Sequence, residues 1–293
     1  MKKILALLVV LTCVLAAGRA FASGGDEMAE KKGILIVSFG TSMPEARKAI
    51  DTLVDAARTA YPEMEVRVAY TSNIIRRKIL KEQGLDIPTP TKALAQMNDE
   101  RFTHVYVQPT HIIPGEEYED LESVVEGFAG MRGKYGFEHI ALGKPLLTNA
   151  EDCNIMAGIL ARRFAAEKGK TIVLMGHGTP EHMAHALYSQ LQIALDKARF
   201  GRFAVGTVEI TPVFEDVLAR VKKTGSRRVL LAPFMIVAGD HANNDLADPE
   251  DPESWFSRFK KAGYTVETSL VGIGEYPEIV KLFTENLKAL IRE

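Results

Sequence analysis

Cysteine is nearly absent from this chain. Only Cys13 and Cys153 occur among its 293 residues, and Cys13 lies in an N-terminal apolar segment that we expect to be removed. A single remaining cysteine forms no intramolecular disulfide and supplies no cage of thiolates around a metal ion. These absences exclude a disulfide-rich scaffold and a thiolate zinc site, so the fold must depend on its apolar core.

Long apolar runs are also missing beyond the N-terminus. Residues 4–17 form one apolar stretch, which is shorter than the roughly 20 residues that a membrane-spanning helix needs. Two lysines precede this stretch and a small-x-small cleavage pattern follows at residues 20–22. We therefore predict that residues 1–22 are a cleaved signal peptide and that no membrane anchor remains. In a bacterium, this would deliver the mature protein to the periplasm.

An excess of basic charge is likewise absent. The chain has 36 Lys and Arg against 38 Asp and Glu, a formal net charge of −2. Loss of the three basic residues within residues 1–22 reduces 36 to 33 against 38, a net charge of −5. We therefore expect no nucleic-acid partner. The segments GTSMPEA and GHGTPEH match neither the phosphate-loop nor the dinucleotide fingerprint, so no nucleotide cofactor is predicted.

What the chain does contain is internal repetition. Three pairs of segments follow the same order in two halves, and each pair shares an apolar run and the residues after it. The pairs are GILIVSFGTSMPEA (33–46) with KTIVLMGHGTPEHMA (170–184), VRVAYTSNII (66–75) with GTVEITPVF (206–214), and VYVQPTHIIPGEEYEDL (105–121) with VLLAPFMIVAGDHANNDL (229–246). We infer a duplicated unit, with an N-terminal α/β domain at 31–150 and a C-terminal α/β domain at 151–293, which we expect to carry a metal site.

Each half alternates short apolar runs with longer helical patterns. Residues 34–39 precede the helical pattern of 44–60, and further apolar runs follow at 64–71 and 103–110. This alternation predicts an α/β fold of two similar Rossmann-like domains, each a parallel sheet flanked by helices, with a cleft between them. The last helix, 277–292, is expected to pack across the domains.

Titratable residues stand at the predicted strand ends of the second half. His177 ends its first strand, Glu209 ends its second, and His241 follows its third. The carboxyl ends of parallel strands meet at one edge of a sheet, so these side chains are expected around one divalent metal ion. Glycines beside His177 let a ligand approach its ring closely. Each residue alone also fits an ordinary strand-end or loop position; their matching positions favour the metal site.

The motifs GHGTPEHM, TVEITPVFEDV, FMIVAGDHANNDL and THIIPGEEYEDL together resemble the anaerobic cobalt chelatases that act on sirohydrochlorin. These enzymes belong to the ATP-independent chelatases that include ferrochelatase. The resemblance implies that His177 and His241 are catalytic residues in a cleft and that Glu209 is the acidic residue between them. It further implies a tetrapyrrole substrate, a homo-oligomer and insertion of Co²⁺, with Fe²⁺ as the alternative metal.

Metal insertion requires two pyrrole N–H protons to leave while the cation exchanges water for ring nitrogens. Imidazole suits both tasks, because it takes up protons near neutral pH and binds divalent metals less firmly than a thiolate cage does. We therefore expect His177 to accept protons, and His177, Glu209 and His241 to be the metal ligands.

Four further residues are weaker candidates for substrate binding. Glu117 lies in an acidic segment that either attracts the cation or stabilises a helix start through the macrodipole. Arg76 and Arg77 either bind substrate carboxylates or form a solvated helix face. His111 either lines the pocket or ligates haem, as could His104, for which a structural role is the simpler interpretation.

Two alternatives remain open at this point. His182 and His185 form an i, i+3 pair that either binds zinc or belongs to the surface or cleft wall, and no His-Glu-x-x-His motif accompanies them. A periplasmic carrier of metal or haem is the rival function, because an exported two-domain α/β chain with a cleft also describes binding proteins. Turnover separates the two functions, since a carrier binds stoichiometrically and stops. A purely structural domain would leave the three strand-end residues unexplained.

Overall fold

The computed structural model describes residues 30–198 and 201–292. The predicted signal peptide, residues 1–22, lies outside the described residues. Lys31–Glu293 make up one compact unit, which holds both halves of the repeat. Within the described part of the chain, no helix is long and apolar enough to cross a membrane.

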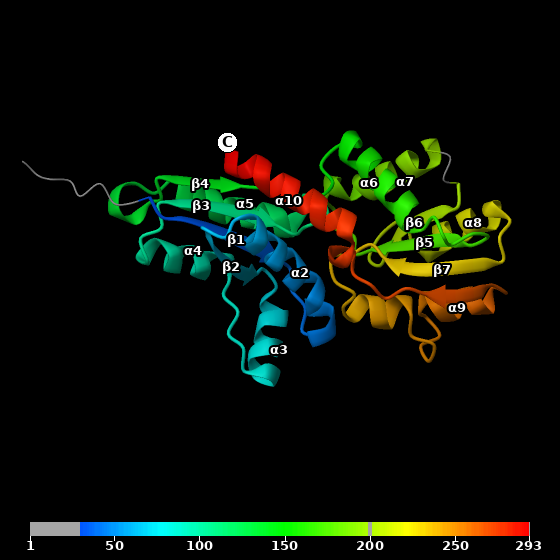
Figure 1. Ribbon diagram of the computed structural model, residues 1–293. Helices are drawn as coiled ribbons and strands as arrows, with labels where there is room; N and C mark the ends of the chain where they lie inside the picture. The colour runs from blue at the N-terminus through cyan, green and yellow to red at the C-terminus, as the bar shows by residue number, and fades with distance from the viewer. Residues whose placement is uncertain (1–29, 199–200, 293) are drawn as a thin grey trace, which may run out of the picture. The chain divides into compact units, whose positions relative to one another are not determined.

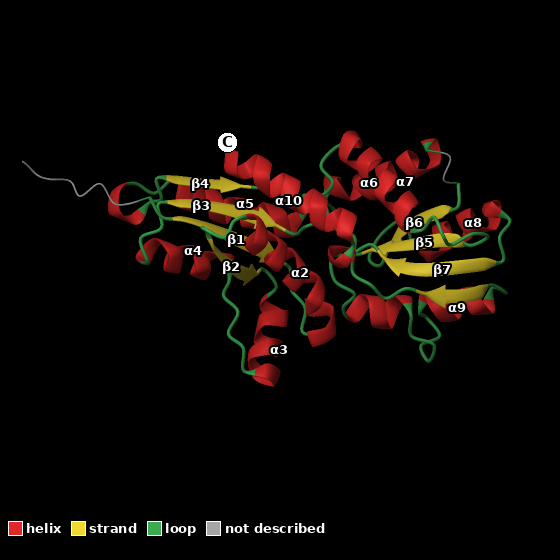
Figure 2. Cartoon of the chain, viewed as in Figure 1, coloured by secondary structure: helices red, strands yellow, loops and turns green. Residues whose placement is uncertain are grey.

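Two parallel sheets of the same strand order form the framework (Figure 1 and Figure 2). The first consists of β1 (Lys32–Ser38), β2 (Glu65–Tyr70), β3 (His104–Pro109) and β4 (His139–Leu142), in the order β2-β1-β3-β4. The second consists of β5 (Thr171–Gly176), β6 (Phe203–Thr207), β7 (Arg228–Pro233) and β8 (Thr265–Thr268), in the order β6-β5-β7-β8. The repeated order confirms the predicted fold of two similar α/β domains with parallel sheets.

Helices follow the strands in both halves and cover the sheets (Figure 2). The first half contains α2 (Pro44–Ala60), α3 (Asn73–Gln83), α4 (Pro90–Asp99), α5 (Glu116–Ala129) and the turn η1 (Gly133–Tyr135). The second contains α6 (Ala150–Arg163), η2 (Met183–His185), α7 (Ala186–Lys197), α8 (Phe214–Thr224), the π-helical turn η3 (Ala242–Leu246), α9 (Trp255–Lys261), η4 (Ile273–Glu275) and α10 (Pro277–Arg292).

Helix α2 shows why these segments are helical. Pro44 stands at its start, where the backbone N–H that proline lacks would have no partner inside the helix. Its buried side chains recur every three or four residues, from Ala46 through Leu53 to Ala57, which places them on one face against the sheet. The central strands β1 and β5 are buried almost throughout, as expected for strands with helices on both faces.

The last helix, which was expected to pack across the domains, contacts the cores of both halves. Ile279 near its start is buried in the same cluster as Ile172 and Leu174 of β5, and its later residues pack against the first half. Phe283, Leu287 and Leu290 of α10 are buried in the same apolar cluster as Ile34 of β1 and Ile50 of α2. In Figure 1, α10 is drawn in red beside the first sheet. Burial of one such side chain contributes about 1.5–3 kcal/mol, so α10 is a large part of the first half's core.

Both sheets share a feature that positions the site. The strand order reverses direction between β1 and β3 in the first sheet and between β5 and β7 in the second. Loops that leave neighbouring strands at such a point run to opposite faces of the sheet and leave a crevice at the carboxyl ends. A ligand site is therefore expected after these four strands.

Candidate functional site

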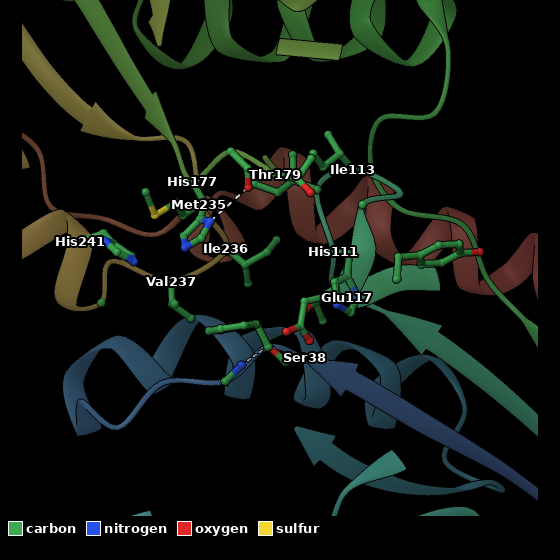
Figure 3. A pocket seen from close by; sticks show the side chains of 18 of the residues that line it. Ser38, His111, Ile113, Glu117, His177, Thr179, Met235, Ile236, Val237 and His241 are labelled. Atoms are coloured by element: carbon green, nitrogen blue, oxygen red, sulfur yellow. Dashed lines mark hydrogen bonds between the residues drawn. The ribbon is translucent and has the colours of Figure 1, made fainter. Parts of the chain in front are cut away.

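One pocket lies at the carboxyl ends of the strands of both halves. It is a cavity of about 530 Å³, lined by residues that follow β1, β3, β5, β6 and β7, and its size is typical of small-molecule sites. Figure 3 shows His177 and His241 on one side of this pocket and His111 and Glu117 on the other. Both crevices therefore contribute to a single cavity.

His177 is held at the end of β5 by its glycine neighbours. A Cβ atom at Gly176 would collide with the ring of Tyr188, which packs directly over the strand end. Gly178 has φ of +102°, a backbone conformation that residues with a side chain rarely adopt. The ring of His177 is thereby directed toward the pocket, with its Nδ1 3.1 Å from the carbonyl oxygen of Gly178.

Glu209 lies beside His177 although β6 ends two residues earlier than expected, at Thr207. The backbone N–H of Val208 donates to Gly176 O at 3.0 Å, and that of Glu209 donates to His177 O at 3.2 Å. These bonds continue the pairing of β5 with β6 beyond the regular strands. As a result, the Glu209 carboxylate Oε2 lies 3.6 Å from His177 Nδ1.

His241 approaches His177 from the loop after β7. It precedes the π-helical turn η3, a form of helix frequent at functional sites. The ring centroids of His241 and His177 are 4.7 Å apart and the rings are nearly perpendicular, at 78°. His241 Nδ1 lies 2.7 Å from Asp245 Oδ2. Because an ionised carboxylate only accepts, Nδ1–H donates and the Nε2 lone pair stays available for a ligand.

The three predicted metal ligands therefore line one pocket, but they do not form a closed cage. Among residues 30–198 and 201–292, no group of three or more His, Cys, Asp or Glu side chains is arranged to hold a metal ion. The arrangement is instead an imidazole pair, seen in Figure 3, with the Glu209 carboxylate 3.6 Å from His177 Nδ1. A metal here would need further ligands from solvent or from a bound molecule, which suits transfer better than storage.

The first half contributes an aromatic ring and carboxylates to the pocket. Phe39 follows β1, is 42% exposed and has its ring centroid 6.3 Å from that of His177. Glu116 and Glu117 lie in the first turn of α5 and also line the pocket. Phe39 was not predicted as a pocket residue, because in the sequence it resembles the last apolar residue of a strand. The aligned repeats could have identified it, since Phe39-Gly40 matches His177-Gly178.

Charge in the pocket is of one sign. Four carboxylates line it, those of Glu116, Glu117, Glu209 and Asp240, and no Lys or Arg is among its described lining residues. Such a cavity attracts a cation. The structure does not bring the predicted Arg76 and Arg77 into this lining. Arg76 Nε instead donates to Ile87 O at 2.7 Å, and Arg77 is exposed on α3.

His111 occupies the first-half wall in an unusual state. Its Nδ1 and Nε2 are both buried and have no hydrogen-bond partner, although the residue lines the pocket. This burial lowers the pKa of His111 to about 4, so its imidazole is neutral at pH 7. His104 begins β3 and lies against His139, with ring centroids 5.7 Å apart, at the strand end away from the pocket.

The His182 and His185 pair is already engaged in internal bonds. His182 Nδ1 accepts from the N–H of Ala184 at 3.1 Å, and its Nε2 lies 2.9 Å from Glu119 Oε1 in the first half. His185 Nδ1 accepts from the N–H of Thr179 at 3.4 Å, and its Nε2 donates to the carbonyl of Thr211. All four ring nitrogens have partners, which disfavours a zinc site. The pair instead has a structural role, because its contacts join neighbouring segments of the chain.

Comparison with known proteins covers most of the chain. The cobalt chelatase (CbiK) family matches residues 32–292. A sirohydrochlorin cobaltochelatase of Salmonella typhimurium is 34% identical over 259 residues, which is 88% of this chain and 95% of that protein. The sirohydrochlorin cobaltochelatase CbiKC of Nitratidesulfovibrio vulgaris is 34% identical over 263 residues, 89% of this chain and 91% of that protein.

Solved structures of lower sequence identity share the fold. The structure of SirB from Bacillus subtilis with Fe³⁺ has a TM-score of 0.59 at 15% identity and covers 89% of this chain and 95% of its own. CbiX, described as the terminal enzyme of sirohaem biosynthesis in denitrifying bacteria, has a TM-score of 0.53 at 15% identity, covering 88% of this chain and 98% of its own.

Proposed function

The chain belongs to the cobalt chelatase (CbiK) family, and we propose that it inserts Co²⁺ into sirohydrochlorin or a closely related tetrapyrrole without ATP. The observation that carries this proposal is the pairing of His177 with His241 in a pocket that Glu209 also lines and that no described Lys or Arg lines. Imidazoles bind the ion and take up protons there, and the carboxylates attract a cation.

The proposed reaction exchanges protons for metal. Two pyrrole N–H bonds break as the four ring nitrogens bind Co²⁺, so two protons must leave the macrocycle. His177 accepts one proton and passes it to solvent before it accepts the second, and the Glu209 carboxylate 3.6 Å from Nδ1 stabilises each imidazolium that results. His241 offers its free Nε2 to the incoming ion while Asp245 holds the ring through Nδ1. Release is favoured because the protein does not enclose the ion.

The proposed ligands accept more than one divalent metal. Imidazole nitrogen and carboxylate oxygen bind Co²⁺ and Fe²⁺ alike, so the pocket accepts Fe²⁺ as an alternative substrate. An absorbance assay of sirohydrochlorin with each ion, without ATP, tests the proposal. We expect a large molar excess of macrocycle to be metallated, faster with Co²⁺. Conversion that stops at one equivalent of protein would instead indicate a carrier of metal or tetrapyrrole.

Export to the periplasm is part of the proposal. It is supported by the apolar stretch and cleavage pattern within residues 1–22, and the family match begins only at residue 32. N-terminal sequencing of the native protein from the periplasmic fraction should give Ser23 as the first residue. A cytosolic protein that begins at Met1 would contradict export and leave the chelatase activity unaffected.

Assembly into a homo-oligomer also belongs to the proposal, on the strength of the resemblance to the chelatases. Light scattering of the purified mature chain, at several concentrations, measures its mass against the monomer. A constant monomer mass would contradict this part.

A further inference from the structure

His111 is the pocket residue whose state the proposed reaction leaves unexplained. Among the described side chains with buried, unpartnered polar atoms, it alone lines the pocket. Leaving a buried donor or acceptor without a partner destabilises a protein, so such groups call for a ligand or a special role. Both imidazole nitrogens are in this position here.

The ring is held in place by its surroundings. The backbone carbonyl of His111 accepts from the N–H of Leu146 at 3.0 Å, which fixes the segment after β3. Tyr118 packs edge-on against the imidazole with ring centroids 6.2 Å apart, and its own hydroxyl donates to Gly143 O at 3.2 Å. The backbone at His111 is therefore fixed, and a rotation of the imidazole about χ2, which exchanges its nitrogens with ring carbons, is the movement that would present a nitrogen to a ligand.

The charge of the pocket limits what that ligand group can be. Four carboxylates and no Lys or Arg line the cavity among the described residues, so the carboxylates of a tetrapyrrole substrate are expected outside it and not against His111. A neutral imidazole has one N–H and one lone pair. The inner edge of a metal-free tetrapyrrole is uncharged and carries N–H groups that donate to such a lone pair.

We propose that His111 accepts a hydrogen bond from a pyrrole N–H of the metal-free tetrapyrrole, on the side of the pocket opposite the His177 and His241 pair. This inference rests on the proposed chelatase function. Because the imidazole is a weak base in this environment, it orients the macrocycle and leaves proton uptake to His177.

The contact also distinguishes substrate from product. Metal insertion removes the pyrrole N–H protons, so the metallated ring has no donor left for the His111 lone pair. The buried nitrogen is then unpartnered again, which weakens binding of the product relative to the substrate. His111 thereby favours entry of the metal-free ring and release of the metallated one.

The test measures binding of two ligands to the full mature chain. Sirohydrochlorin, with a chelator present, and its cobalt complex are titrated against wild type, His111→Phe and His111→Gln. His111→Phe should weaken affinity for the metal-free ring about tenfold, as expected for one hydrogen bond, and leave affinity for the cobalt complex unchanged. His111→Gln keeps an acceptor and should recover part of the loss. His104→Phe makes the same change on β3 outside the pocket and should alter neither affinity.

Kinetics and stability provide further readouts. In turnover, His111→Phe should raise KM for sirohydrochlorin and leave kcat and its pH profile unchanged. It should not lower the melting temperature, because it removes unpartnered buried nitrogens; should it fail to fold, His111→Gln carries the comparison.

Four results would overturn the inference. Equal weakening of both ligands would mean that His111 acts through pocket shape. Weaker binding of the cobalt complex alone, with a changed visible spectrum, would mean that His111 ligates the inserted metal. If wild type turns over substrate and His111→Phe still prefers the metal-free ring, this contact is refuted and the proposed function stands. A wild type that neither binds nor turns over tetrapyrrole would refute both.

Discussion

The two halves of the molecule share a backbone geometry and differ in the chemistry placed on it. After β5 stand His177 and Gly178, and after β1 stand Phe39 and Gly40. The two glycines have φ of +102° and +100°, so the chain turns in the same way at both strand ends. The side chain before the glycine is an imidazole in one half and a phenyl ring in the other.

The second pair of loops repeats this contrast. The turn after β7 ends in His241, and the matching turn after β3 carries Glu117 in the aligned GDH and GEE segments. One duplicated framework therefore provides a pocket whose two walls differ, with two imidazoles and the Glu209 carboxylate on one side and a phenyl ring and the carboxylates of Glu116 and Glu117 on the other. The flat macrocycle that we propose as substrate would meet a different environment on each face.

The largest expected effect comes from removing the imidazoles of the second half. His177→Ala, alone or combined with His241→Ala, should lower chelatase turnover by about 10²–10⁴-fold, since general acid–base groups contribute on that scale. Circular dichroism should stay unchanged, because the His177 side chain is 39% exposed and contributes little packing. The absorbance assay with Co²⁺ measures the loss. Near-normal turnover of the double variant would remove these residues from the mechanism.

A second experiment compares the two turn glycines directly. Gly178→Ala should lower the free energy of unfolding by about 1–2 kcal/mol, the strain of a side chain in the left-handed region. Gly40→Ala should cost about 3 kcal/mol or more, because its Cβ would also collide with the buried ring of Tyr70. Urea denaturation gives both values. Equal losses would show that the two turns are packed alike.

A third, somewhat smaller effect concerns His111 in the first half, which should make the stability of the protein depend on pH. Burial lowers the pKa of His111 from 6.5 to about 4, so the unfolded chain binds more protons than the folded one between these values. Stability is therefore fully present above pH 6.5 and is lost as pH falls toward 4. Between pH 7 and pH 5, the free energy of unfolding of wild type should fall by about 2 kcal/mol relative to that of His111→Phe, as measured by urea titration at each pH. A constant difference between the two proteins would contradict this.

The smallest effect is expected for the ion pair that joins the two halves. His182→Ala removes the 2.9 Å contact with Glu119, whose side chain is 60% exposed. It should lower the free energy of unfolding by less than about 1 kcal/mol, as exposed pairs do, and change turnover by less than about twofold. This variant is also the control for His177→Ala. A large loss of activity would mean that the contact of His182 with Glu119 is needed for the pocket to function.

Much of the fold could be predicted from the sequence because its signals are local. Pro44 and Pro277 mark helix starts, and the helices at 44–60 and 277–292 have the predicted bounds. The duplicated segments predicted two similar domains, each with a parallel sheet. The predicted end of the sixth strand at Glu209 was wrong, because this boundary depends on pairing beyond the regular strand. Glu209 follows β6 by two residues and is held by hydrogen bonds to the end of β5.

The pocket was less accessible to sequence reasoning, because its lining depends on which side of each element faces inward. In α3, Ile75 lines the pocket, while the next residue, Arg76, turns away to the carbonyl of Ile87. A basic cluster on a helix does not reveal that rotation. Similarly, the buried and unpartnered state of His111 arises from Tyr118 and the surrounding loops, and no motif records it.

The placement of α10 has a consequence for the order of folding. Phe283, Leu287 and Leu290 complete the core around β1 and α2, which precede them by more than two hundred residues. The first half therefore keeps one apolar face uncovered until residues 277–292 reach it. Until then, this face is a surface through which the incomplete chain can aggregate.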